Sequence, residues 1–416
     1  MVDRQRVVVT GLGVITPVGI GIDRFWEAIR AGRSGVKRIA GMETDDLLVK
    51  IAATVDDFEP ERFINRKEAR RMDRSTQMAV AASHMAIDDA GLAEGSFDPY
   101  DIGVSIGTGI GGMRTFEDEF TTFLEDGPRR VSPFLAPMMI PNMPAGQVSI
   151  QLGVRGPSRC LATACATGSD CIGEAFEIIR RGTVPLMIAG GVDSTITRFV
   201  ISAFTNCKVL SRRNDDPAKA SRPFERDRDG FVMGEGAGIV ILESREHALA
   251  RGARIYAEVR GYGATADAFH MTSPDSSGEP MARAMHMALT EAGVSASEVD
   301  YLNAHGTSTV LNDKYETLSI KNAFGKGAHR LPISSTKSMV GHLIGAAGAV
   351  EFIVTVLSIR AGYVHPTINL DNPDPECDLD YVPHVGRRHE IGIAMTNSLA
   401  FGGHNASLVV AHPDAV

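Results

Sequence analysis

The chain contains a weak internal repeat, and this repeat constrains its fold more than any other feature of the sequence. Residues Met85–Leu92 (MAIDDAGL) resemble Met287–Val294 (MALTEAGV), at an offset of 287 − 85 = 202 residues. Asp101–Thr108 (DIGVSIGT) resembles Asp300–Thr307 (DYLNAHGT), at an offset of 300 − 101 = 199 residues. Because the two matches keep their order and nearly the same offset, we interpret them as two copies of one unit.

Each copy combines a helix that ends at glycine, a short acidic loop and an apolar strand that ends in Gly-Thr. A second strand and a small-residue helix follow, at 158–164 and 168–181 in the first copy and at 331–335 and 341–360 in the second. Alternating strands and helices predict an α/β fold with largely parallel sheets covered by helices. We expect the copies to divide near 251–260, which gives an N-terminal half of 1–253 and a C-terminal half of 254–416.

Composition excludes several other classes of protein. The 416 residues are 44% hydrophobic and 22% charged, which is typical of a soluble globular protein. The formal net charge of −9 argues against a nucleic-acid partner. The five cysteines are odd in number and contain no C-x-x-C pair, so they suggest neither a disulfide framework nor a zinc site. We expect no metal and no cofactor. With no signal-like start and no unbroken run of about 18 apolar residues, we expect a cytoplasmic protein without a membrane partner.

Cys165 is the candidate nucleophile. It lies in LATACATGSD, residues 161–170, between a strand-like run and a predicted helix. A thiol at a helix N-terminus faces unpaired backbone N–H groups and the positive end of the helix dipole, which stabilise the reactive thiolate. The small neighbours of Cys165 leave room for a bulky acyl thioester.

Two histidines are candidates for the same site. His305 follows a predicted strand in NAHGTST, and His342 lies in the glycine- and serine-rich stretch 334–348. Imidazoles suit hydrogen bonding to a developing oxyanion and proton exchange near neutral pH. Lys337 and Glu351 flank His342, and the sequence leaves open whether they orient the site or form a buried ion pair.

A glycine-containing loop near the C-terminus, 397–405, separates two strand-like runs. Consecutive glycines at 402 and 403 can bring backbone N–H groups close to a ligand, and an N–H there, with that of Cys165, would form an oxyanion hole. The alternative is an ordinary hairpin turn.

Taken together, these segments resemble the β-ketoacyl-acyl carrier protein synthases, and most closely the elongating synthase II class. The resemblance runs from Val7 to Asn405, and its most specific motifs are TACATG (163–168), SRPF (221–224), DRDGFVMGEGAG (227–238), NAHGTST (303–309) and STKSMVGH (335–342). It implies a thiolase-like α/β fold, with duplicated halves in five α-β-α-β-α layers, and a homodimer.

The resemblance also implies an activity: decarboxylative condensation of a malonyl group with an acyl chain that is held on Cys165, both delivered by acyl carrier protein. His305 and His342 would stabilise the malonyl enolate, and the N–H groups of Cys165 and Phe401 would hold the thioester oxygen. Lys337 and Glu351 would support the site. The substrate-binding positions that the resemblance implies are Thr307 and Thr309 for the pantetheine arm, and Ile110, Phe204 and Phe231 for the acyl pocket. His270 is a further candidate substrate-binding residue, although the sequence leaves its role open.

An acidic carrier protein requires a basic surface on its partner. The basic residues that match this need are Lys67, Arg70, Arg71, Arg129 and Arg130, although solvated helix charge is the simpler explanation for any one cluster.

Two departures from the family pattern affect the pocket. Ala400 replaces the first glycine of the gating loop, and residues 206–208 are Asn-Cys-Lys, where small residues and arginine are commoner in the family. The resemblance also leaves open a structural cation near Glu351 and Asn397.

Rival functions are distinguished by their catalytic residues. Thiolases use a second catalytic cysteine and chain-initiating synthases pair cysteine with histidine and asparagine, so neither matches His305 plus His342. A non-catalytic chain-length partner would lack the nucleophile that Cys165 supplies. An iterative polyketide ketosynthase stays open, because the same triad serves both pathways.

Overall fold

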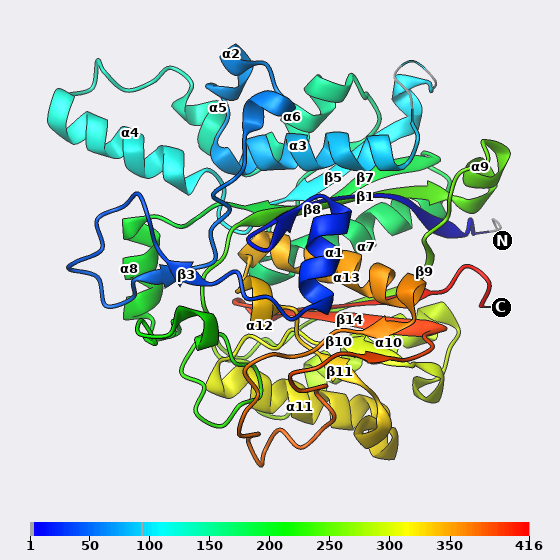
Figure 1. Ribbon diagram of the computed structural model, residues 1–416. Helices are drawn as coiled ribbons and strands as arrows, with labels where there is room; N and C mark the ends of the chain where they lie inside the picture. Colours follow the sequence, from blue (N-terminus) through cyan, green and yellow to red (C-terminus); the bar gives the residue numbers. More distant parts are fainter. Residues whose placement is uncertain (1–3, 93–94, 96, 416) are drawn as a thin grey trace.

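The computed structural model describes residues 4–92, 95 and 97–415 (Figure 1). Within these residues eleven strands form one sheet in the order β11-β10-β14-β15-β9-β1-β8-β7-β5-β6, with β2 paired to β1 beside this path. Its strands are β1 (Val7–Thr16), β2 (Gly19–Ile20), β5 (Ile102–Gly107), β6 (Ser158–Arg159), β7 (Leu186–Asp193), β8 (Gly236–Ser244), β9 (Ala257–Ala266), β10 (Tyr301–Asn303), β11 (Ile333–Ser334), β14 (Ile393–Ala400) and β15 (His404–Ala411). Two further pairs consist of β3 (Lys37–Arg38) with β4 (Ile51–Ala52), and β12 (Tyr363–Val364) with β13 (Arg387–Arg388).

The strand order contains the same pattern twice. The first half contributes β6-β5-β7-β8-β1, and the second contributes β11-β10-β14-β15-β9. In each half the strand that carries the repeat, β5 or β10, pairs in parallel with both its neighbours. This correspondence confirms the duplication that the sequence predicts.

The expectation of largely parallel sheets is wrong for half of these pairings. In each half the two remaining pairs, β7–β8 and β8–β1 or β14–β15 and β15–β9, are antiparallel. The turn 401–403 shows one physical reason, because a connection this short can join only strands that run in opposite directions.

The two halves are joined at one edge, where Val7–Val9 of β1 pair with Ala257–Val259 of β9. The expected division after residue 253 lies between α9 and β9, just before this contact. The exact boundary stays a prediction.

Helices cover both outer faces of the sheet and fill the space between its halves (Figure 1). The α-helices are α1 (Ile22–Arg30), α2 (Arg66–Ala69), α3 (Arg74–Asp89), α4 (Met113–Asp126), α5 (Leu135–Met139), α6 (Met143–Leu152), α7 (Thr167–Arg180), α8 (Arg198–Asn206), α9 (Arg245–Ala250), α10 (Glu279–Ala292), α11 (Val310–Phe324), α12 (Lys337–Val340) and α13 (Ala347–Ala361). Helix α3 packs on the strands of the first half, α10 packs on those of the second, and α7 and α13 lie between them. This is the predicted five-layer α/β arrangement.

Helix α13 shows why the middle layer forms. Its residues 347–359 are all buried, and a helix that is apolar on all sides must be enclosed on all sides. The stretch 344–361 is long and apolar enough to cross a membrane by composition, but 89% of it is buried inside the protein. Short 3-10 turns, η3 (Ala164–Ala166) and η7 (Ile344–Ala346), precede α7 and α13. These turns bring the two halves' candidate residues to one place.

Candidate active site

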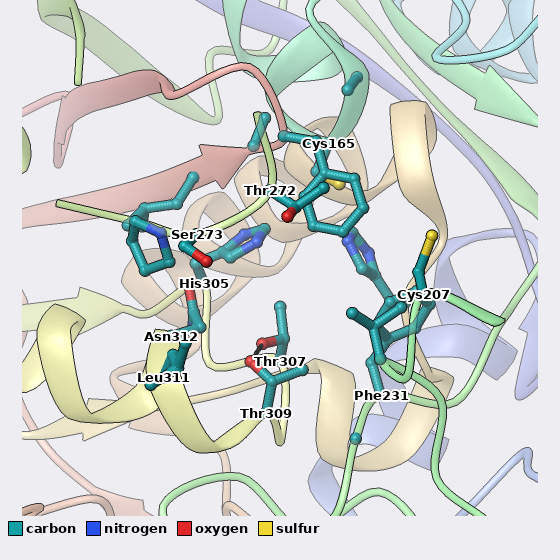
Figure 2. A pocket seen from close by; sticks show the side chains of 18 of the residues that line it. Cys165, Cys207, Phe231, Thr272, Ser273, His305, Thr307, Thr309, Leu311 and Asn312 are labelled. Atoms are coloured by element: carbon teal, nitrogen blue, oxygen red, sulfur yellow. Dashed lines mark hydrogen bonds between the residues drawn. The ribbon is translucent and has the colours of Figure 1, made fainter. Parts of the chain in front are cut away.

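A cavity of about 350 Å³ opens between the two halves of the chain. In Figure 2 the side chains of Cys165 and His305 face this cavity, and Thr307 and Thr309 line it further along. Nine of the predicted site residues lie on its wall, namely Ile110, Cys165, Phe204, Phe231, His305, Thr307, Thr309, His342 and Phe401.

Cys165 is the middle residue of η3, directly before α7. The residue before it, Ala164, has φ +49°, a left-handed conformation that costs free energy for a residue with a side chain. Burial raises the pKa of the Cys165 thiol to about 12, while Lys337 and the Phe401 N–H act in the opposite direction. Burial outweighs these two effects, so the resting side chain is a thiol.

The two histidines form an edge-to-face pair, with ring centroids 5.4 Å apart and planes at 88°. The Lys337 ammonium lies 3.2 Å from His305 Nδ1, and the Ile344 N–H donates to His342 Nδ1 at 3.3 Å. An ammonium and an amide N–H can only donate, so both Nδ1 atoms accept. Each neutral imidazole therefore carries its proton on Nε2.

The charge state of this pair follows from its surroundings. Burial, then Lys337 and His342, lower the pKa of His305 well below the ordinary imidazole value. Burial and Lys337 lower the pKa of His342 in the same way. Both rings are therefore uncharged at neutral pH, and they act as hydrogen-bond donors through Nε2–H.

Lys337 serves both of the roles that the sequence left open. Its Nζ donates to Glu351 Oε1 at 2.5 Å, in an ion pair whose side chains are 1% and 2% exposed. The same Nζ contacts His305, so the buried pair also fixes the histidine's tautomer. Burial raises the pKa of Glu351 to about 7, against the lowering effect of Lys337.

Several buried oxygens near this pair have no hydrogen-bond partner among the described residues, including Glu351 Oε2, Asn303 Oδ1 and Thr396 Oγ1. Asn303 and Thr396 are partners in register on β10 and β14. Such oxygens suit the cation that the resemblance left open. Asn397 is less available, because its Oδ1 accepts a hydrogen bond from Ser407 Oγ at 2.8 Å.

The loop 401–403 is both a hairpin turn and a wall of the cavity. It connects β14 to β15, with φ +86° at Gly402 and +76° at Gly403, while the Phe401 N–H faces the Cys165 thiol and favours its charged form. The Phe401 ring lies 6.3 Å from that of Phe204, centroid to centroid. Phe231 continues the row, 5.7 Å from Phe204 and 5.1 Å from the His342 ring. The loop therefore connects an aromatic pocket to the nucleophile.

Comparison with known proteins identifies this arrangement. Residues 4–248 match the model of the β-ketoacyl synthase N-terminal domain, and residues 256–371 match that of the C-terminal domain. The chain belongs to the β-ketoacyl synthase family. It is 50% identical over 406 residues to 3-oxoacyl-acyl-carrier-protein synthase 2 of Synechocystis sp., which covers 98% of each chain. It is 51% identical over 409 residues to the synthase 2 of Staphylococcus aureus, covering 98% of this chain and 99% of that relative.

A solved structure supports the same fold. A type II polyketide ketosynthase in complex with its acyl carrier protein superimposes with a TM-score of 0.92 at 37% identity, covering 99% of this chain and 100% of that one. These matches confirm the predicted family, the thiolase-like ketosynthase fold and the assignment as a condensing acyltransferase.

In this β-ketoacyl synthase, His270 is outside the cavity wall. It is exposed, and its Nδ1 accepts the N–H groups of Thr272 and Ser273, both at 3.1 Å. His270 therefore shapes a turn, and the residues after it, Thr272 to Pro274, line the cavity.

The five basic residues predicted for carrier docking are all exposed and lie away from the cavity wall. In the described part of the chain, none of them has a carboxylate within ion-pair distance. The Arg71 guanidinium lies over the ring of Phe134, 4.6 Å from its centroid. This contact joins the segment after α2 to the loop that carries Arg129 and Arg130.

Two buried carboxylates that the sequence did not indicate contact the site. Glu316 accepts the His305 N–H and the Gly306 N–H, each at 2.7 Å. Asp193, at the end of β7, accepts the N–H of Gly109 at 2.8 Å and that of Gly345 at 2.6 Å, and so connects the halves. Glu316 could have been noticed as an acidic residue on the helix directly after the NAHGTST motif, whereas Asp193 is indistinguishable in sequence from a residue that ends a strand.

Proposed function

We propose that this synthase elongates fatty acyl chains by decarboxylative condensation of malonyl-acyl carrier protein with an acyl group held on Cys165. One observation carries the proposal: a half-buried thiol and the Phe401 N–H share a cavity with two neutral imidazoles that present Nε2–H. The names of the relatives at 50% and 51% identity support fatty-acid synthesis over polyketide synthesis.

In the acyl-transfer step, Cys165 Sγ attacks the thioester carbonyl of the incoming acyl-carrier. The N–H groups of Cys165 and Phe401 stabilise the oxyanion that forms. The new S–C bond forms as the pantetheine S–C bond breaks, and the thiol proton leaves on the pantetheine sulfur. The thiol therefore needs no permanent thiolate, which is consistent with its raised pKa.

In the condensation step, the malonyl carboxyl group leaves as carbon dioxide or bicarbonate. The enolate oxygen accepts hydrogen bonds from His305 Nε2–H and His342 Nε2–H, and burial together with Lys337 keeps both rings neutral. The enolate carbon then attacks the Cys165 thioester, and the Cys165–acyl bond breaks. Cys165 leaves as a thiolate, which takes up a proton from water to restore the resting thiol. Neutral donors suit this role, because they stabilise a developing charge without giving up their protons.

The cavity wall supports separate places for the two parts of the substrate. Thr307 Oγ1 and Thr309 Oγ1 lie 2.9 Å apart and provide hydroxyls for the pantetheine arm. Phe204, Phe231 and Ile110 provide an apolar surface for the acyl chain.

Acyl carrier protein is the proposed macromolecular partner, as in the ketosynthase complex of similar fold. The five unpaired basic residues provide the positive surface for it. Substitution of Lys67, Arg70 and Arg71 by Glu is expected to weaken the binding of carrier-linked substrates far more than that of pantetheine-linked mimics. Added salt is expected to reduce this difference in binding.

A second copy of the chain is the proposed subunit partner. Large apolar side chains are exposed on and after α4, including Phe120 (50%), Phe123 (43%) and Leu124 (67%), and such a patch is typical of a protein interface. Light scattering should give about twice the chain mass of 44.5 kDa, and Phe120→Glu with Phe123→Glu should lower it to the monomer. We also propose a cytoplasmic location, which the free state of all five cysteines supports.

The direct test is an assay of the purified protein with malonyl-carrier and acyl-carriers of graded length. A β-ketoacyl product extended by a single malonyl unit supports the proposed function. Products extended repeatedly without reduction would favour an iterative polyketide ketosynthase, and no product with any acyl-carrier would favour a non-catalytic partner.

A further inference from the structure

Asp170 is a buried carboxylate in the first turn of α7, and it has no part in the chemistry described above. Its relative exposure is 6%, and in the described residues no cation lies within ion-pair distance of it. Two hydroxyl groups bind it instead: Thr163 Oγ1 donates to Oδ2 at 2.5 Å, and Tyr262 Oη donates to Oδ1 at 2.8 Å. Burying a carboxylate costs free energy unless such bonds compensate, so these donors are needed.

The first donor, Thr163, directly precedes the turn that carries Cys165, residues 164–166. Thr163 is two residues before Cys165, and the residue between them, Ala164, has φ +49°. The N–H of Thr163 donates to Thr167 Oγ1 at 2.9 Å, while its hydroxyl donates to Asp170. The N–H and the hydroxyl of Thr163 are thus both bound to α7. A strained backbone persists only when its surroundings hold it, and these two bonds hold this turn.

The second donor comes from the other half of the chain. Tyr262 is on β9, and its ring lies against the backbone of α7 at Gly173, where a Cβ would be 2.4 Å from the nearest ring carbon. This close packing leaves Tyr262 little freedom to move. Tyr262 of the second half therefore fixes the position of Asp170. Asp170 in turn fixes Thr163, next to Cys165, in the first half.

We propose that Asp170 is a positioning residue for acyl transfer: through Thr163 it holds the strained turn in which the Cys165 sulfur and N–H face the Phe401 N–H. Tyr262 fixes the position of Asp170. This inference rests on the proposed function, in which Cys165 receives the acyl group. Since the histidines are held separately, by Lys337 and the Ile344 N–H, the effect is confined to the acyl-transfer half-reaction.

Thr163→Val is the decisive variant, because it keeps the shape of the side chain and removes only the hydroxyl. It is expected to slow acylation of Cys165 by about 10- to 100-fold, the scale of a displacement of about 1 Å in a reacting group. Malonyl decarboxylation is expected to stay within about twofold of wild type, the scale expected when the donors that stabilise the enolate are untouched. Thr163→Ser is the matched control, which keeps the hydroxyl and is expected to acylate at nearly the wild-type rate.

A double-mutant cycle identifies Asp170 as the partner of Thr163. Asp170→Asn keeps an oxygen that can accept from Thr163 and is expected to retain most activity, whereas Asp170→Ala removes it. If the two residues act through one bond, Thr163→Val with Asp170→Ala should acylate no more slowly than Asp170→Ala alone. If Asp170→Ala does not fold, the comparison of Thr163→Val with Thr163→Ser still decides the proposal.

Two results would overturn it: wild-type acylation by Thr163→Val, or equal losses of acylation and decarboxylation in that variant. The first excludes a role for the bond, and the second indicates a general structural defect. If wild-type enzyme itself is not acylated, the proposed function fails instead, so the two failures can be told apart.

Discussion

The nucleophile turn, residues 164–166, and the histidine turn, residues 344–346 just after His342, occupy equivalent places in the two halves but contain different residues. Each is a 3-10 turn directly before a middle-layer helix, and the first residue has a left-handed backbone in both: φ is +49° at Ala164 and +51° at Ile344. The next residue is Cys165 in the first half and Gly345 in the second. The shared backbone is therefore a product of the duplication, and the reactive side chain is particular to one copy.

Their surroundings explain the difference. Cys165 lines the cavity, whereas a Cβ on Gly345 would be 2.4 Å from the Gly109 N and 2.6 Å from Asp193 Oδ2. At the ends of the repeated strands it is the second half that supplies the reactive side chain. Ile106 of the first half is fully buried in the core, whereas its counterpart in the second half, His305, lines the cavity. The first half thus supplies the reactive thiol and the second supplies the imidazoles, so the two half-reactions depend on different reactive side chains.

The largest expected effect is that of Cys165→Ala. Acyl transfer should fall below detection, because no other residue of the turn can form the thioester. Malonyl decarboxylation should persist, and the melting temperature should stay close to that of wild type. Quenched-flow acylation and a carbon dioxide release assay measure the two half-reactions, and transfer of an acyl chain to this variant would contradict the assignment.

His305→Ala and His342→Ala should have the converse effect. Removing one donor to a developing oxyanion typically costs about 100- to 1000-fold in rate, so malonyl decarboxylation should fall by that factor in each variant. Acylation of Cys165 should fall much less. A near-normal decarboxylation rate in either variant would show that the second half does not supply this chemistry.

Gly345→Ala tests the unequal space at the two turns. Because the new Cβ would meet a backbone nitrogen and a buried carboxylate, the free energy of unfolding should fall by about 1–3 kcal/mol, as in other overpacked cores. Chemical denaturation beside Cys165→Ala, which removes an atom at the equivalent position, is the matched comparison. Equal stability of the two variants would mean that the histidine turn can accept a side chain after all.

Lys337→Met should move the pH profile of decarboxylation. Burial lowers the pKa of both imidazoles, and the Lys337 ammonium lowers it further because it disfavours a second positive charge. Removal of the ammonium leaves the effect of burial and raises both pKa values part of the way toward the ordinary value of about 6.5. Wild-type decarboxylation should stay constant as the pH falls through about 6.5 and decline only at lower pH, whereas the variant should decline at higher pH than wild type. Superimposable profiles between about pH 5 and 8 would exclude this role for Lys337.

Ala400→Gly should have the smallest effect. Ala400 is paired with His404 in the hairpin, and the positive φ values of the turn are at Gly402 and Gly403. A glycine at 400 changes the conformational free energy of the loop by about 0.5–1 kcal/mol, because it has more backbone freedom than alanine. The acylation rate should therefore change by about two- to fivefold, and the decarboxylation rate should hardly change. Identical acylation rates across chain lengths would place the hinge elsewhere in the loop.

The repeat predicted the duplicated topology because two copies of the same succession of helices and strands fold in the same way. Motif context also placed Cys165, His305 and His342 on one cavity. The sequence could not show that Glu316 binds the His305 N–H or that Asp193 connects the halves, because these contacts form only when distant segments pack. The role of His270 was open in the sequence, and in the structure two local N–H groups bind its Nδ1 outside the cavity wall.

The division of labour between the halves is tested most directly by the intact mass of the His305→Ala/His342→Ala double variant after incubation with acyl-carrier protein. We expect the mass of one acyl group to be added, at Cys165, to nearly the same extent as in wild type. Subsequent malonyl-carrier should then release no β-ketoacyl product. A double variant that folds but remains unacylated would contradict the account, because the thiol of the first half would then depend on the imidazoles of the second.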